Sequence, residues 1–282
     1  EFPTVPAAEC SMYCMGTVKS PADRGEDVPQ EQPVTIVAAI DASSSMRGDG
    51  KAGAVIEAMK AVIGILKDSD SLCIVAYACK VQVILPATYM DEVGKTQARN
   101  AIEAIQVKGM TNLAGALEEC FDQLRRATDS NTITAIWLFT DGQATVGTTT
   151  TDVGLASLVR CHMENVKRQC SVMTFGFGAD HSSDTLIGVA TAGKGVYYNI
   201  VTNADIAECF ADCLGGLFSV FAQHLCLVAR VTMPGVTICD VETPYPFEID
   251  VGQTSVTVVI PDLYAEEQRD VLVRLRLPAA EP

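Results

Sequence analysis

Residues 34–46 read VTIVAAIDASSSM. The first seven are all apolar or β-branched, which is the pattern of a strand buried on both faces. Polar residues follow at once, because Asp41, Ser43 and Ser45 stand in a D-x-S-x-S spacing. A buried strand that ends in one carboxylate and two hydroxyls predicts a parallel sheet with a ligand site at its carboxyl edge.

Strand-like runs alternate with helical patterns from this stretch to about residue 222. Apolar residues at three- and four-residue spacing predict helices at 51–67, 96–106, 113–127, 152–169, 183–192 and 203–222. Further strands are predicted at 72–78, 81–86, 132–140, 170–178 and 195–201. A short turn joins the first two of these, so we expect them to be antiparallel. The alternation predicts an α/β fold with a doubly wound, mostly parallel six-stranded sheet and helices on both faces, as in Rossmann-like proteins.

The periodicity changes after residue 222. Five short runs follow, LCLVARVTM, VTICDVE, FEIDV, SVTVVIP and DVLVRLRLP, with Pro, Gly and Asp between them. They predict a small antiparallel β-sandwich. Residues 9–18 alternate in the same way, and we expect them to complete it. The predicted domains are therefore an α/β domain at 34–222 and a β-sandwich module formed from both termini, 1–33 and 223–282.

Composition narrows the classes of partner. The chain has 282 residues, 48% of them hydrophobic, and a formal net charge of −15. This acidity argues against nucleic-acid binding and against attachment to anionic lipid. The sequence has no apolar run of about 20 residues, so we expect no membrane span. The start EFPTVPAAEC lacks the pattern of a signal peptide, and the abrupt ends EFP and AEP fit a fragment of a larger protein.

The 11 cysteines mostly occur inside apolar segments, among them Cys73 and Cys79 in SLCIVAYAC and Cys170 in CSVMTFGFG. No pair has the spacing of a zinc site. We expect most to be core thiols in a reducing compartment, which favours a cytoplasmic location. A disulfide framework in an extracellular protein is the alternative.

Two residues far along the chain complete a candidate metal site. Thr111 precedes a helix in KGMTNLAG, and Asp141 follows a strand in IWLFTDG. A strand order of 3-2-1-4-5-6 would bring Asp41 and Asp141 side by side. With Ser43 and Ser45 they form an all-oxygen set that suits Mg²⁺, or alternatively Mn²⁺ or Ca²⁺. Two carboxylates balance a divalent ion and leave coordination positions for water or for an Asp or Glu of a partner. Capping of the 51–67 helix is the simpler alternative for the first motif.

The five candidate residues together resemble the metal-ion-dependent adhesion site of the von Willebrand factor A family, and the resemblance covers about 34–222. It implies a metal-dependent protein-protein interaction or adhesion module, without catalysis, in which the cation bridges the site and an acidic residue of a protein partner. Two positions depart from the family pattern. Ser44 replaces the usual glycine, and Met110 stands where small residues are common.

Further segments resemble plant RING-finger proteins in which a von Willebrand A domain is followed by a β module. They are FPTVPAAEC, TFGFGADH, CLGGLFSV and DLYAEEQRDVLVRLRLP. Those proteins are ubiquitin ligases, so the resemblance implies a substrate-binding or scaffold region of a larger ligase as an alternative function. The sequence has no RING pattern of cysteines and histidines, and ligase activity is therefore not carried over.

Two other functions are weighed against these. An extracellular adhesin is suggested by the family and by the tripeptide Arg47-Gly48-Asp49, although a turn is the expected role of that tripeptide. A metal-assisted hydrolase is disfavoured, because none of the three histidines adjoins a site residue. We expect His162 to be a core or boundary residue, and Asp180 and His181 to form a cap or turn.

Overall fold

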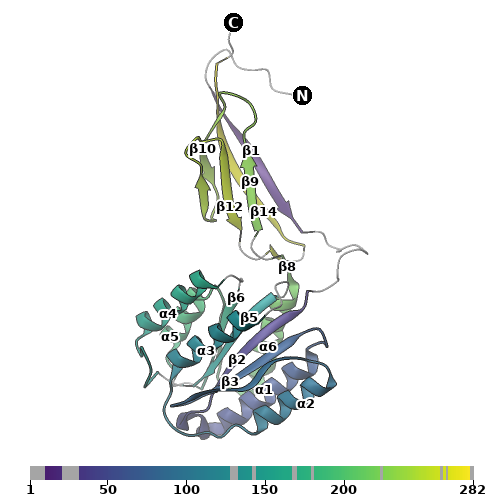
Figure 1. Cartoon of the computed structure of the whole chain (residues 1–282), viewed down its shortest axis with the longest axis vertical. Helices are drawn as coiled ribbons and strands as arrows, with labels where there is room; N and C mark the ends of the chain where they lie inside the picture. The colour runs from purple at the N-terminus through teal and green to yellow at the C-terminus, as the bar shows by residue number, and fades with distance from the viewer. Residues whose placement is uncertain are drawn as a thin grey trace. The chain divides into compact units, whose positions relative to one another are not determined.

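The computed structural model of the chain describes residues 10–20, 32–127, 133–141, 144–166, 170–178, 181–222, 225–260, 263–264 and 266–279. The chain divides into two compact units (Figure 1). One is Glu31–Phe218, and the other combines Glu1–Gln30 with Ser219–Pro282. Within the described ranges, no helix has the length and hydrophobicity that a membrane span requires.

The Glu31–Phe218 unit is built on a six-stranded sheet in the order β4-β3-β2-β5-β6-β7. Only β3 and β4 are antiparallel neighbours, and the other pairs are parallel. This is the predicted 3-2-1-4-5-6 order, so the α/β fold prediction is confirmed. The strands are β2 (Val34–Asp41), β3 (Ser71–Tyr77), β4 (Val81–Tyr89), β5 (Ile133–Thr140), β6 (Cys170–Phe177) and β7 (Tyr197–Ile200).

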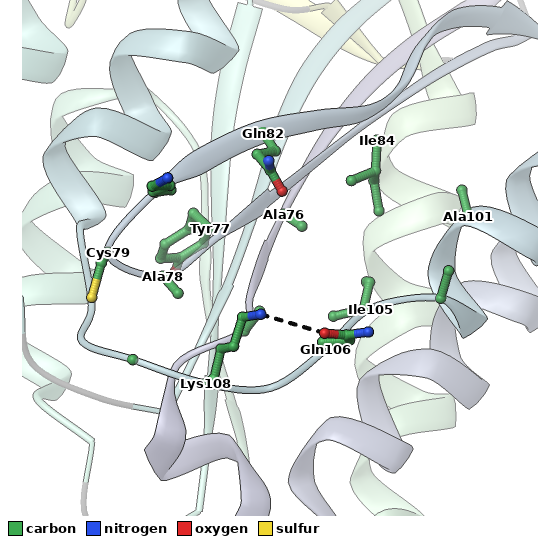
Figure 2. A pocket seen from close by; sticks show the side chains of 14 residues that line it. Ala76, Tyr77, Ala78, Cys79, Gln82, Ile84, Ala101, Ile105, Gln106 and Lys108 are labelled. Atoms are coloured by element: carbon green, nitrogen blue, oxygen red, sulfur yellow. Dashed lines mark hydrogen bonds between the residues drawn. The ribbon is translucent and has the colours of Figure 1, made fainter.

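Helices cover both faces of this sheet, α3, α4 and α5 on one and α1, α2 and α6 on the other (Figure 1). The turn between β3 and β4 lies beside the segment that follows α2 (Figure 2). The helices are η1 (Ser44–Gly50, a 3-10 helix), α1 (Lys51–Ile65), α2 (Glu92–Glu103), α3 (Leu113–Arg126), α4 (Asp152–Asn165), α5 (Ser183–Ala192) and α6 (Asn203–Ser219).

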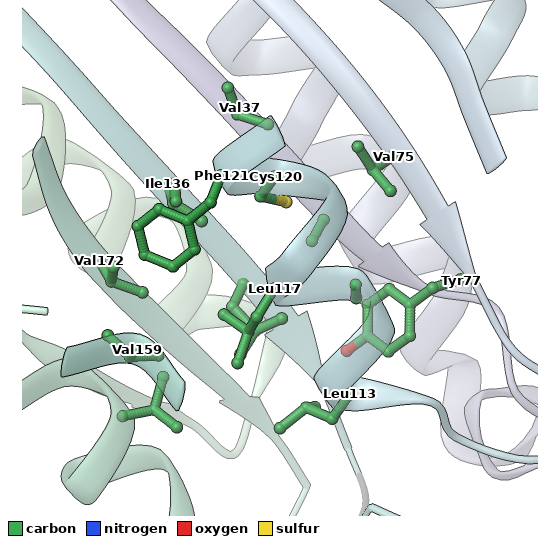
Figure 3. Close-up of a cluster of buried hydrophobic side chains, with 14 of the residues drawn as sticks. Val37, Val75, Tyr77, Leu113, Leu117, Cys120, Phe121, Ile136, Val159 and Val172 are labelled. Atoms are coloured by element: carbon green, nitrogen blue, oxygen red, sulfur yellow. The ribbon is translucent and has the colours of Figure 1, made fainter. Parts of the chain in front are cut away.

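Each face of the sheet has its own core. Under α3, the side chains of Leu117 and Phe121 pack against Val37 and Ile136 of the central strands (Figure 3). On the other face, Phe210 of α6 stacks with ring centroids 5.7 Å from Phe139 and 4.9 Å from Phe175. All residues of β2 and β5 are buried, as the uninterrupted apolar runs predict.

Helix ends differ from the prediction at several places, and α1 and α2 end at Ile65 and Glu103 instead of 67 and 106. Helix α2 begins at Glu92 instead of 96, because the Asp91 side chain caps it by accepting the Gly94 N–H at 2.7 Å. Helix α6 stops at Ser219, and the strand β8 (Val220–Ala222) replaces the predicted last turn, in keeping with the β-branched and aromatic residues there. Helix α4 ends at Asn165 instead of 169, because Val166 is already in an extended conformation, and residues 167–169 lie outside the described part.

The second unit holds two three-stranded antiparallel sheets, in the orders β1-β14-β10 and β11-β12-β9, and a small β8-β13 pair. Strand β1 pairs with β14 along its whole length, from Cys10↔Leu277 to Lys19↔Gln268. Residues of both three-stranded sheets share one buried cluster, so the sheets form a sandwich. The strands are β1 (Cys10–Lys19), β9 (Leu225–Arg230), β10 (Thr237–Glu242), β11 (Phe247–Ile249), β12 (Ser255–Ile260), β13 (Leu263–Tyr264) and β14 (Gln268–Leu277).

The aromatic stack gives a stability prediction. We expect Phe210→Ala to lower the free energy of unfolding of the α/β unit by about 3–5 kcal/mol, because it leaves a cavity between α6 and the sheet. The ring of Trp137, the single tryptophan, lies 5.7 Å from that of Phe210, so its fluorescence in urea reports on this unit. Ile187→Ala, at a position 46% exposed, is the control and should change stability by less than about 0.5 kcal/mol. Equal losses in both variants would contradict the assigned packing.

Candidate functional site

The two aspartates of the candidate site meet at the carboxyl edge of the sheet. In the parallel register Ile40 pairs with Phe139, so Asp41 lies beside Thr140 and the next residue is Asp141. The Thr140 hydroxyl donates to Asp41 Oδ2 at 2.7 Å. Asp41 and Asp141 are only 2% and 3% exposed, so both carboxylates are held in a buried position.

The two serines connect these carboxylates. The backbone N–H of Ser43 donates to Asp41 Oδ1 at 2.8 Å, and the hydroxyls of Ser43 and Ser45 lie 3.0 Å apart. The Ser45 hydroxyl donates to Asp141 Oδ1 at 2.7 Å. Four of the five predicted residues therefore form one hydrogen-bonded network. The capping alternative has no support, since neither η1 nor α1 has a side-chain cap.

Thr111 is brought to this edge by its loop and, among the described residues, is not part of the hydrogen-bonded network. The loop before α3 is tied to the first motif, because Ser44 N–H donates to Gly109 O and Gly109 N–H donates to Ser44 Oγ, both at 2.9 Å. Ser44, the departure from the family pattern, thus binds the two loops together. Thr111 itself is buried, and its N–H donates to Thr145 Oγ1 at 2.9 Å.

Lys51 is a site residue that the sequence analysis missed. Its ammonium lies 2.9 Å from Asp141 Oδ2, on the other side of the carboxylate from Ser45. The side chain passes Gly178, where a Cβ atom would come within 2.8 Å of Lys51 Cε. A positive charge in the first turn of α1 is unfavourable to the helix dipole, and this was the available signal that Lys51 has an acidic partner.

The electrostatics of the site favour a cation. Burial raises the pKa of the Asp41 carboxyl above its usual value, hydrogen bonds from Ser43 and Thr140 oppose this, and the negative charge of Asp141 raises the pKa further. Two carboxylates and the Lys51 ammonium leave a net charge of −1 in a confined space. A positive ion beside Asp41 would relieve that unfavourable burial of charge.

The donor set fits a hard divalent ion. Within the described part of the chain, no three His, Cys, Asp or Glu side chains gather into a possible metal-binding group. The candidate set combines two carboxylates with hydroxyls. Its oxygens are the ligands that Mg²⁺ takes, and a site with few carboxylates retains positions for water or an incoming oxygen. Asp41, Ser43, Ser45, Thr111 and Asp141 would hold the ion.

Other residues singled out from the sequence have structural roles. Arg47 of the Arg-Gly-Asp tripeptide donates from Nε and Nη2 to Val107 O, at 2.9 and 2.6 Å, and so holds a neighbouring loop. The ring of His162 stacks on Phe121, as expected of a boundary residue. His181 bonds to Gly178 O and to Tyr197, which agrees with the predicted turn, whereas Asp180 lies outside the described residues.

The expectation that most cysteines are core thiols is wrong, because only four of the eleven are buried, and Cys79 is among those that are not. All eleven cysteines are free, and Cys73, Cys120, Cys170 and Cys213 are buried. Cys79 is exposed, because its apolar segment ends at Tyr77 and the thiol stands in the turn between β3 and β4.

Comparison with known proteins identifies the family. The model of the von Willebrand factor type A domain matches residues 34–199, from the first residue of β2 into β7. The chain belongs to the von Willebrand factor type A domain family. Domains of this family generally act as protein-interaction modules, and the expected membership of the family is confirmed.

Relatives extend this similarity to the second unit. The chain is 31% identical over 266 residues to the E3 ubiquitin-protein ligase WAV3 of Arabidopsis thaliana, an alignment that covers 90% of this chain and 32% of the relative. It thus spans about a third of the length of that relative.

Two solved structures share the fold. A von Willebrand factor type A protein from Catenulispora acidiphila has a TM-score of 0.68 at 18% identity, over 98% of this chain and 63% of that one. Proximal thread matrix protein 1 from the mussel byssus, with a zinc-occupied MIDAS motif, has a TM-score of 0.53 at 16% identity, over 71% and 47%.

The position of Lys51 gives a prediction about the metal. We expect Lys51→Met to raise the Mg²⁺ affinity of the chain roughly tenfold, because removal of a competing positive charge strengthens the attraction of Asp141 for the ion. The metal-free form should lose about 1–3 kcal/mol of stability, since a buried carboxylate loses a charged hydrogen bond. Titration calorimetry and urea unfolding measure the two effects.

Lys60→Met is the matched control, because Lys60 pairs with Glu57 and Glu103 at partly exposed positions away from the site. It should leave the Mg²⁺ affinity unchanged. A Lys51→Met variant that binds Mg²⁺ no better than the parent would contradict the assigned competition.

Proposed function

We propose that the chain is a non-catalytic, metal-dependent protein-interaction module. A divalent cation, with Mg²⁺ the first choice, would be held by Asp41, Ser43, Ser45, Thr111 and Asp141 and would bind an Asp or Glu of a protein partner. The observation that carries the proposal is the buried network in which Ser43 and Ser45 connect the two aspartates. Membership of the von Willebrand A family supports the same role.

The charge of the site accounts for an acidic partner. Asp41, Asp141 and Lys51 carry a net charge of −1, and a divalent cation would change this to +1. A site with surplus positive charge and hydroxyl ligands favours a further carboxylate. The remainder of the chain is strongly acidic, with a net charge of −15, so an acidic partner would be attracted at this site and repelled over much of the rest.

The described histidines do not support a hydrolase. A metal-assisted hydrolase needs a base or nucleophile close to the ion. His162 stacks on Phe121, and His181 is bound to Gly178 O and Tyr197, so neither is hydrogen-bonded to a site carboxylate. His224 lies outside the described residues.

The first test separates metal binding from folding. We expect Asp41→Asn to keep the fold, because the side chain retains its shape, and to lower Mg²⁺ affinity about a hundredfold or more through loss of a ligand charge. In a pull-down from native lysate analysed by mass spectrometry, partners held in Mg²⁺ should be lost in EDTA and in Asp41→Asn.

Asp240→Asn is the control, since Asp240 belongs to the second unit and pairs with Arg274. It should retain every partner that the unmodified chain retains. Capture that is indifferent both to EDTA and to Asp41→Asn would reject the proposed function.

The similarity to WAV3 favours a second candidate, in which the chain is the substrate-binding or scaffold region of a larger ubiquitin ligase. The chain alone should then form no ubiquitin conjugates with activating enzyme, conjugating enzyme and ATP, because it lacks a RING pattern. Proteins captured in Mg²⁺ should be ubiquitylated in a lysate that contains the longer protein and remain unmodified when that protein carries Asp41→Asn. Conjugates made by the isolated chain would point to an enzyme instead.

A further inference from the structure

A pocket of about 750 Å³ opens beside the candidate metal site. Its walls are the end of the β3–β4 hairpin, the C-terminal part of α2 and the segment 104–109, and we call it the hairpin pocket (Figure 2). Its volume lies within the range of clefts that bind small molecules or side chains, about 300–1,000 Å³. None of the residues that line the hairpin pocket is assigned to the metal.

The hairpin pocket shares two loops with the metal site. Ala42, which lines it, stands between Asp41 and Ser43, and the N–H of Lys108 donates to Ala42 O at 2.7 Å. Gly109, another lining residue, lies two positions before Thr111, so their Cα atoms are at most about 7.6 Å apart. An extended peptide of two or three residues, about 7–10 Å long, can therefore span the distance between these two loop positions.

The lining of the pocket combines apolar side chains with two lysines. Ile84, Ala101 and Ile105 face the cavity from three directions (Figure 2). Lys80 and Lys108 also line it, and no Asp or Glu does so among the described residues. Among the described residues, the Lys108 ammonium has one long contact, to Gln106 Oε1 at 3.4 Å, so its charge is available. In a chain of net charge −15, two lysines without an acidic neighbour in the lining form a local positive region.

We infer that the hairpin pocket binds an apolar side chain of the same partner segment whose Asp or Glu binds the proposed metal site. The segment carries its metal-binding Asp or Glu, an apolar side chain two or three residues away that enters the pocket, and a further acidic residue beside Lys80 and Lys108. This inference rests on the proposed function, because the metal supplies the first anchor. The pocket selects among acidic segments, which the metal alone does not distinguish.

A display experiment tests the inference. A phage-displayed library of random 12-residue peptides is selected on the immobilised full chain in Mg²⁺, and enriched peptides are synthesised for affinity measurement. We expect an acidic residue, an apolar residue at the stated spacing and a second acidic residue. Affinity should fall at least about tenfold in Ala101→Phe, which fills the pocket, and in the double variant Lys80→Glu, Lys108→Glu.

Two controls make the result specific. Lys95→Glu changes the charge of α2 at a residue outside the lining and should leave affinity unchanged. Cys79 lines the pocket and is exposed, and its Sγ accepts the Met110 N–H at 3.1 Å, so a peptide bound across the pocket and the 109–111 loop should slow its alkylation, whereas exposed Cys161 on α4 should react as before. Peptide mass spectrometry follows both thiols, and this readout does not depend on any substitution.

The outcomes separate the two proposals. Peptides that need Mg²⁺ and Asp41 but bind the Ala101→Phe and lysine variants normally, without protecting Cys79, would overturn the inference and leave the proposed function standing. Peptides that bind in EDTA and to Asp41→Asn, or a selection that yields no Mg²⁺-dependent peptide, would reject the proposed function and the inference with it. Loss in the pocket variants together with protection of Cys79 supports the inference.

Discussion

The parallel pairing of β2 with β5 is the constraint on which the site depends. Its register places Asp41 beside Thr140, and the bond from Thr140 to Asp41 fixes that arrangement. A slip of one residue would turn alternate side chains of these fully buried strands to the opposite core and would separate the carboxylates. The cores on both faces therefore act together to hold two negative charges at one edge of the sheet.

Burial of like charges is unfavourable, and the structure offsets it in several ways. Ser43, Ser45 and Thr140 supply hydrogen bonds to the carboxylates, and Lys51 supplies one positive charge. The raised pKa of Asp41 shows that this compensation is incomplete for that carboxyl. Burial of two carboxylates with partial compensation supports the proposed cation site, since binding an ion would release the remaining penalty.

The sequence allowed most of the fold and four members of the hydrogen-bonded network to be predicted, because both follow from periodicity and from the ends of strands. The role of Lys51 was not predicted, because helical spacing indicates which face of a helix is buried and not which group a long side chain contacts. Cys79 was misplaced because hydrophobic neighbours in sequence do not show where a strand ends and its turn begins. The Ser44 hydroxyl accepts a hydrogen bond from Gly109, 65 residues further along the chain, and no local sequence pattern indicates such a contact.

The hairpin pocket illustrates a general difference between anchoring and selection. A divalent ion binds any accessible carboxylate, so the metal site alone gives little discrimination among acidic proteins. An apolar cavity adds discrimination by shape, and the two lysines favour one distribution of negative charge over others. Three lining residues, Ala42, Lys108 and Gly109, belong to the loops that carry the candidate metal ligands, and the Lys108–Ala42 and Ser44–Gly109 bonds join these loops. A partner that supplies a carboxylate to the proposed metal site and an apolar side chain to the pocket would hold the loops in the arrangement that the metal requires. A partner that offers only a carboxylate would leave the pocket and its lysines unoccupied.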